Sequence, residues 1–254
     1  MTIVLALGAT FLLPGEFHRL ANSTMAALGF ASNLHFWQIS DYFAPSAELM
    51  PLLHTWSLGV EEQFYILFPL AMILAFKWRR HRYLAPLALA AAASFAIGLA
   101  IAPRSPVAAF YLLPIRAWEL LIGAMVAVAP FGARLTELQR SLAAALGAAL
   151  VLLAITFVRA GPGFPIPFAL LPTVGAALLI ACGEGTFAGR ALAWSPLRYI
   201  GRISYSAYLW HWPIIAFYRI ETGIELGTLE TAGLVIASLA AGSISYHLVE
   251  RPFM

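Results

Sequence analysis

One segment of the chain concentrates side chains that can transfer protons. On a helix, His54, Glu61 and Tyr65 share one face, and Ser57 lies four residues before Glu61. An imidazole, a carboxylate and a phenol are the usual groups of acid–base catalysis. The pattern predicts a site whose catalytic candidates are His54, Glu61, Glu62 and Tyr65, with Ser57 as a binding residue. The alternative is a capped helix end at a membrane interface, which suits His54 better than Glu61.

A second group combines opposite charges within a long apolar stretch. Arg116 and Glu119 stand three residues apart on one helical face, so they can neutralise each other. One interpretation is an ion pair that merely allows the helix to enter a membrane. The other is a polar pocket to which Arg116, Glu119 and Glu61 contribute, with Arg116 holding an anionic group of a substrate.

A third group lies near the C-terminal end. Ser204, Tyr208 and His211 fall on one helical face, which makes Tyr208 and His211 candidate binding residues. Pro213 has no N–H to donate to the carbonyl four residues back, so we expect a kink near Leu209. The alternative is interfacial aromatic residues around one hydrogen-bonded histidine.

The composition indicates which kind of protein positions these groups. Of 254 residues, 61% are hydrophobic and 11% are charged, with a mean hydropathy of +0.83. A soluble domain carries about 25% charged residues, so the chain is predicted to lie in a membrane. The excess of basic residues is therefore interpreted as a topology signal and not as a nucleic-acid surface. The single cysteine, Cys182, excludes an internal disulfide and a cysteine metal cluster, and no metal is expected.

Uncharged runs long enough to cross a bilayer predict an all-α, polytopic transmembrane bundle. A run at 1–14 is short and resembles the end of a helix whose beginning is absent. Segment 15–56 is expected outside the cytoplasm, with a helix over Met25–Trp37 lying on or dipping into the membrane. We interpret 1–254 as one domain. The predicted full spans, about seven in number, are 57–76, 84–103, 109–130, 141–158, 166–183, 203–219 and 228–248.

The basic residues predict the orientation of these spans. The cluster Lys77–Arg82 is expected in the cytoplasm, because cytoplasmic loops carry an excess of lysine and arginine. Alternation then places 131–140, 184–202 and the C-terminus inside. The remaining connections, expected outside, are 104–108, 159–165 and 220–227.

Four segments together resemble the acyltransferase-3 family of bacterial membrane acyltransferases. They are Pro51–Tyr65 (PLLHTWSLGVEEQFY), Tyr111–Leu120 with its RAWEL sequence, Ile203–Pro213 (ISYSAYLWHWP) and Val249–Phe253 (VERPF). The first is a highly specific match, and the resemblance covers essentially the whole chain. It is closest to the branch that O-acetylates lipopolysaccharide O-antigen and peptidoglycan.

The resemblance implies a multi-pass protein of the bacterial inner (cytoplasmic) membrane, with about ten helices in the family and seven to eight here. It implies transfer of an acyl group, expected to be acetyl, from cytoplasmic acetyl-CoA to a hydroxyl of a cell-surface carbohydrate. Acyl-CoA, the carbohydrate acceptor and membrane lipid would be its partners, with no nucleic acid and no bound cofactor. Glu61 would lie near the reaction centre and orient or accept a proton, while Tyr65 and His211 line the route.

The chain departs from the family at its N-terminus. The first helix of the family carries a histidine preceded by an arginine, and neither is found here, so we expect two helices to be encoded upstream. An SGNH-type esterase domain is possible as a C-terminal extension or a separate protein. A transporter or flippase of a lipid-linked sugar, or a non-catalytic membrane subunit, stays an alternative, and acylation by reconstituted vesicles would separate these readings.

Overall fold

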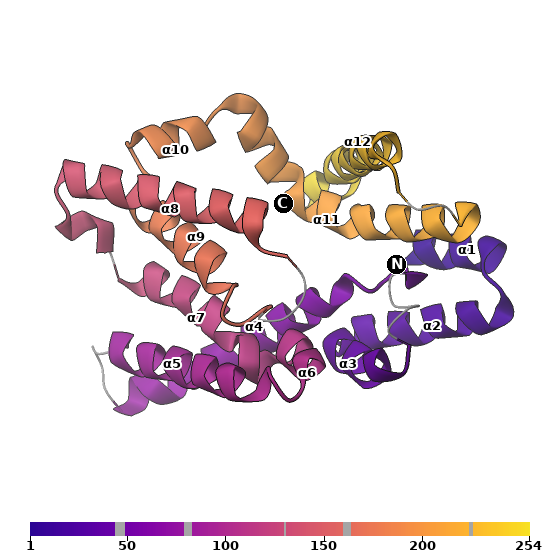
Figure 1. Ribbon diagram of the computed structural model, residues 1–254, viewed down its shortest axis with the longest axis horizontal. Helices are drawn as coiled ribbons and strands as arrows, with labels where there is room; N and C mark the ends of the chain where they lie inside the picture. The colour runs from indigo at the N-terminus through magenta and orange to yellow at the C-terminus, as the bar shows by residue number, and fades with distance from the viewer. Residues whose placement is uncertain (44–48, 79–82, 130, 160–163, 224–225) are drawn as a thin grey trace. The chain divides into compact units, whose positions relative to one another are not determined.

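The computed structural model describes residues 1–43, 49–78, 83–129, 131–159, 164–223 and 226–254, without the side chains of 41–43 and 75–78. Every regular element in these ranges is a helix and none is a strand, which confirms the all-α prediction (Figure 1). The α-helices are α1 (Thr2–Phe11), α2 (Pro14–Leu28), α3 (Ser32–Phe43), α4 (Thr55–Trp78), α5 (Leu84–Ile101), α6 (Pro106–Tyr111), α7 (Leu113–Val128), α8 (Glu137–Phe157), α9 (Leu170–Cys182), α10 (Phe187–Leu192), α11 (Ser195–Thr222) and α12 (Thr228–Ser245). Short turns of other helix types cover Phe131–Arg134, Tyr246–Glu250 and Arg251–Phe253.

Five helical stretches in the described residues are long and apolar enough to cross a membrane. The predicted spans at 166–183 and 203–219 are not among them. Helix α9 has only 13 residues, because turns that contain Pro165 and Pro167 replace its expected first part. Helix α11 has 28 residues, but its serine, tyrosine, tryptophan and histidine residues make it less apolar than the other long helices. The five stretches are Thr55–Leu74, Leu84–Ile101, Pro106–Val128, Glu137–Phe157 and Thr228–Phe253.

One sequence prediction about local structure is wrong, and another holds with an interruption. Met25–Trp37 is not one helix, because α2 ends at Leu28 and a turn follows in which Phe30 has a φ of 56°. The predicted span 109–130 corresponds to the apolar stretch Pro106–Val128, but its helix is interrupted at Leu112, which is extended (φ −91°, ψ 128°) between α6 and α7. Pro114 explains this break: it cannot donate the hydrogen bond that would continue α6 into α7.

The basic segment that set the predicted orientation lies outside the described side chains. Residues 79–82 are not described, and only the backbone of Lys77 and Trp78 is. The membrane orientation and the treatment of 1–254 as one domain stay predictions.

The described chain forms two compact units. The first consists of Met1–Val60 and Ser195–Met254, and the second of Glu61–Trp194. In the first unit, α11 and α12 lie side by side (Figure 1), and α1 and α2 pack around a small core of Val4, Leu20 and Leu52. In the second unit, α5 packs on α7 and α8 packs on α9.

Two glycines bring α8 and α9 into close contact. A Cβ atom built on Gly175 would lie 2.8 Å from the carbonyl oxygen of Gly147, and one on Gly147 would lie 2.7 Å from that of Gly175. Small residues at such positions let helix backbones approach within a membrane, where packing drives association.

We expect Gly175→Ala to destabilise the protein by about 1–3 kcal/mol, because the helices must move apart. Gly123→Ala is the matched control: a Cβ there meets no atom within 4 Å, so the better helix propensity of alanine should leave the protein equal or more stable. Thermal unfolding of both variants in the same detergent measures the difference. Shifts of equal sign and size would contradict the role of this glycine contact.

Candidate functional site

His54 lies in a turn directly before α4. Hydrogen bonds from Leu53 N to Met50 O and from Thr55 N to Leu52 O, each 3.0 Å, close that turn. His54 therefore does not begin the helix that carries Glu61 and Tyr65, which corrects the predicted common helical face. Its side chain is only 6% exposed.

Helix α11 holds this turn by its backbone. The Tyr208 hydroxyl donates a 2.5 Å hydrogen bond to the His54 carbonyl, and the Trp212 Nε1–H donates a 2.9 Å bond to the Met50 carbonyl. Because the tyrosine proton is used in this way, Ser57 Oγ is the donor in its 2.6 Å contact with the Tyr208 oxygen. Ser57 and Tyr208, predicted to bind substrate, thus position His54.

Two aromatic rings of α11 enclose the imidazole. The ring centroids of Tyr208 and His211 lie 5.3 and 5.5 Å from that of His54, both edge to face. His211 Nδ1 lies 2.6 Å from the Tyr208 carbonyl, which can only accept, so Nδ1 carries the proton. In neutral His211, Nε2 is then an acceptor. The predicted grouping of Tyr208 and His211 on one face of α11 agrees with this arrangement.

Both imidazole nitrogens of His54 are buried and have no hydrogen-bond partner in the described structure. A buried polar atom without a partner costs about 1–3 kcal/mol, so such an atom calls for a functional explanation. Burial first, and the positive charge of His211 second, lower the pKa of His54 to about 3. At neutral pH the ring is therefore uncharged and presents one donor and one acceptor, which suits a hydroxyl group that both donates and accepts.

The low pKa of His54 predicts a loss of stability in acid. Below its ordinary pKa of 6.5 the unfolded chain binds a proton that the folded chain rejects until about pH 3. Stability is therefore complete above pH 6.5 and falls as the pH decreases, by about 2 kcal/mol at pH 5. Unfolding of wild type and His54→Phe between pH 7 and 5 isolates this contribution, because phenylalanine cannot titrate.

Replacement of the exposed His18 by phenylalanine is the control for this pH series. It should leave the acid dependence of the wild type in place. The conclusion that His54 is buried and neutral would be contradicted if the stability of His54→Phe depended on acid in the same way as that of the wild type.

The sequence analysis did not identify the residues of α3 that contact the start of α4. Ser32 Oγ donates a 2.6 Å hydrogen bond to the Thr55 carbonyl, and Ser32 and Asn33 are almost completely buried. A Cβ on Gly59 would lie 2.9 Å from Oγ of Ser32 and Oδ1 of Asn33, so glycine lets α4 approach α3. The sequence feature that could have identified them is the Ser32-Asn33 pair three residues after Gly29, because serine and asparagine are typical of a helix start.

Glu61 and Glu62 lie on α4 in the second unit. Both side chains are half-buried, whereas Tyr65 is 58% exposed. The role of Tyr65 in lining the route stays a prediction. The catalytic roles of Glu61 and Glu62 stay predictions.

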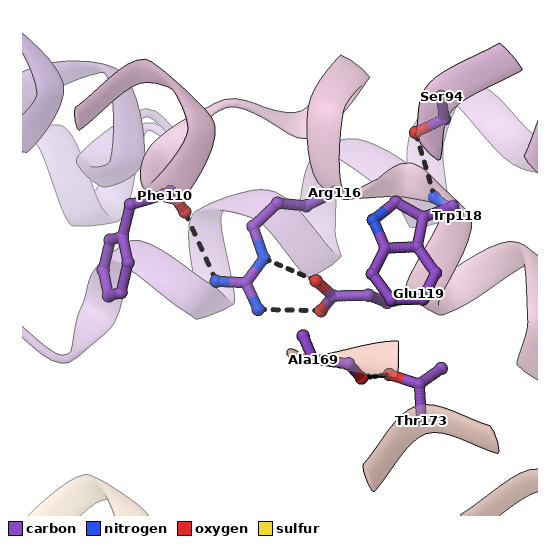
Figure 2. Close-up of polar contacts among 7 residues, drawn as sticks. All are labelled: Ser94, Phe110, Arg116, Trp118, Glu119, Ala169 and Thr173. Atoms are coloured by element: carbon purple, nitrogen blue, oxygen red, sulfur yellow. Dashed lines mark hydrogen bonds and ion pairs between the residues drawn. The ribbon is translucent and has the colours of Figure 1, made fainter. Parts of the chain in front are cut away.

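Arg116 and Glu119 form the predicted ion pair on α7. Arg116 Nε donates to Glu119 Oε1 at 3.0 Å and Nη2 to Oε2 at 2.7 Å, so the guanidinium and carboxylate meet as two parallel hydrogen bonds (Figure 2). The side chains are 14% and 21% exposed. Mutual neutralisation is confirmed, and their predicted contact with substrate stays a prediction.

Pro114 also orients Arg116. Because the proline has no N–H, the carbonyl of Phe110 loses its helical partner, and Arg116 Nη1 donates to it at 3.3 Å (Figure 2). Ser94 Oγ on α5 donates to the Pro114 carbonyl at 2.8 Å and accepts from Trp118 N at 3.1 Å. Trp118 itself is buried with an unpartnered Nε1, which the sequence analysis did not single out.

Comparison with known proteins identifies similar chains. The family model described as "Acyltransferase domain" (acyltransferase-3) matches residues 1–247. A candidate membrane-bound transacylase of Komagataeibacter xylinus is 34% identical over 89% of this chain and 57% of its own length. A candidate peptidoglycan O-acetyltransferase of Bacillus subtilis is 30% identical over 92% of this chain and 40% of its own. A peptidoglycan O-acetyltransferase of Listeria monocytogenes is 26% identical over 99% of this chain and 43% of its own length.

The chain thus spans between 40% and 57% of the length of these relatives. No solved structure matches it significantly.

Proposed function

The chain belongs to the acyltransferase-3 family, and on this premise we propose that it is a membrane O-acyltransferase of the bacterial cytoplasmic membrane. Its donor is acyl-CoA, with acetyl-CoA as the reference donor. Its acceptor is a hydroxyl of a cell-surface carbohydrate such as peptidoglycan or O-antigen. Five apolar helical stretches in the described ranges that are long enough to cross a membrane and relatives named as peptidoglycan O-acetyltransferases support this proposal.

The observation that carries the proposal is the unsatisfied imidazole of His54. It lies in the segment most characteristic of the family, it is buried, and neither of its nitrogens has a hydrogen-bond partner among the described residues. In the proposed reaction the N–H group of neutral His54 donates a hydrogen bond to the oxygen of the acceptor hydroxyl, so the hydroxyl proton can be taken by a separate base. The hydroxyl oxygen then attacks the thioester carbonyl carbon, a C–O bond forms, the C–S bond breaks, and the CoA thiolate leaves.

The proton of the hydroxyl needs an acceptor other than His54 at the end of the step. The low pKa of His54 makes a lasting imidazolium unfavourable, so His54 orients the hydroxyl. We assign the acceptor role to Glu61, as the family motif implies. Arg116 would hold an anionic group of donor or acceptor, and the Glu119 carboxylate sets the direction of its guanidinium.

Transfer by purified protein in sealed vesicles tests the proposal. Radiolabelled acetyl-CoA is supplied on one side and a peptidoglycan fragment on the other. Wild-type vesicles should produce an alkali-labile acetyl ester on the sugar, and vesicles with His54→Phe should not. Carbohydrate that crosses the membrane without gaining acetyl would favour a transporter, and neither product would favour a non-catalytic subunit.

A further inference from the structure

Helices α11 and α12 of the first unit border an open groove of about 430 Å³. Its α12 side consists mainly of aliphatic residues, among them Leu234, Val235 and Leu239. On the α11 side, Ile200 and Ile215 flank Ser204, Tyr208 and His211. Pockets of 300–1,000 Å³ are typical of small-molecule sites.

The lining decides which chemistry the groove accepts. Aliphatic, hydroxyl, phenol and imidazole side chains make up its wall, and among the described residues the lining contains no carboxylate, lysine or arginine. A phosphate or a sugar would lose its hydration there without charged partners, which is unfavourable. A hydrocarbon chain would instead gain about 0.8 kcal/mol for each buried methylene group.

The polar wall of the groove connects it to the candidate site. Tyr208 and His211 line the groove and also contact the His54 ring. Ser204 and His211 add polar side chains to the same wall, whereas the Tyr208 hydroxyl is already bonded to the His54 carbonyl and Ser57. A chain in the groove can therefore carry its terminal carbonyl toward His54 while its methylene groups contact α12.

We propose that the groove holds the acyl chain of the donor thioester, and that the preferred donor has a chain longer than acetyl. This inference rests on the proposed function. At roughly 30 Å³ for a water molecule, the groove has space for about 14 waters, far more than the two-carbon acetyl group occupies. A medium-length chain fills the space and excludes water from the carbonyl.

Binding of acyl-CoA to adjacent tryptophan variants tests this. Val235 lines the groove and is 53% exposed, so Val235→Trp fills the groove without a buried clash. Ile236, the next residue, is 69% exposed and does not line it, so Ile236→Trp is the matched control. The full chain in lipid nanodiscs is titrated with acetyl-CoA and with decanoyl-CoA by calorimetry, with empty nanodiscs as the blank.

Wild type and Ile236→Trp should bind decanoyl-CoA at least ~10-fold more tightly than acetyl-CoA, since each methylene is worth about fourfold. Val235→Trp should lose that preference and keep its acetyl-CoA affinity. An unchanged preference for decanoyl-CoA in Val235→Trp would overturn the proposal. A polyprenyl phosphate is titrated in the same way, and if Val235→Trp weakens its binding but not that of decanoyl-CoA, the groove holds a lipid tail and the proposal is overturned. Equal affinity of the wild type for both donors would overturn the assignment of the groove to the acyl chain but not the proposed function. Binding of neither donor would overturn the proposed function as well.

Discussion

Glu61→Gln is expected to lower acyl transfer by at least ~100-fold with normal amounts of protein in the membrane, the effect of removing an acid–base group. Glutamine keeps the size of the side chain and most of its hydrogen bonding, but it cannot take a proton. Charged groups within membrane spans are costly and therefore usually functional, and Glu61 lies within the apolar stretch Thr55–Leu74. The assay is acetyl ester formation, with the substitution made in the chromosomal gene.

Glu62→Gln is the matched control, because it removes the same charge one residue further along α4. We expect it to reduce transfer much less than Glu61→Gln. Full acylation by Glu61→Gln at equal protein level would leave Glu61 a structural residue. Equal losses in both variants would point to the summed charge of the two carboxylates.

His54→Phe is expected to lower transfer by about 100-fold as well, and to leave the protein at least as stable as wild type at pH 7. Phenylalanine can keep the ring contacts with Tyr208 and His211. It also removes two buried nitrogens that have no partner, so the cost of their desolvation disappears. Loss of activity with equal or higher thermal stability is the signature of a group kept for chemistry.

Tyr208→Phe separates orientation from chemistry. It removes the hydroxyl that bonds the His54 carbonyl and Ser57, so both stability and transfer should fall, the latter by less than in His54→Phe. Normal transfer by His54→Phe would contradict the role of the imidazole. A large loss of stability in His54→Phe would show that His54 is kept for packing.

Local features of the fold follow from the sequence because they depend on neighbouring residues. Long uncharged runs predicted α4, α5, α8 and α12, since an apolar run in a membrane must satisfy its own backbone hydrogen bonds. The spacing of Arg116 and Glu119 predicted their ion pair, because residues three apart meet on one helical face. The family was likewise identified from residue order alone.

Predictions were less successful where one local feature, such as a proline, opposes another, such as an apolar run. Apolar composition predicted spans at 109–130 and 166–183. Pro114 interrupts the helix of the first span, and turns that contain Pro165 and Pro167 replace the start of the second. Segment 15–56 was expected to contain one helix over Met25–Trp37, whereas its described part contains α2 and α3. Ser32 and Asn33 at the start of α3 are buried although they are polar.

Composition and residue order were therefore enough to predict a helical membrane protein of the acyltransferase-3 family and the residue types at its candidate site. How those residues contact one another depends on tertiary packing. Tyr208 and His54 are 154 positions apart, and no periodicity relates such distant residues, because their contact depends on how α11 packs against the turn before α4. That packing directs the Tyr208 hydroxyl to the His54 carbonyl and the Ser57 hydroxyl to the Tyr208 oxygen, and it leaves the His54 nitrogens without a hydrogen-bond partner in the described part of the chain.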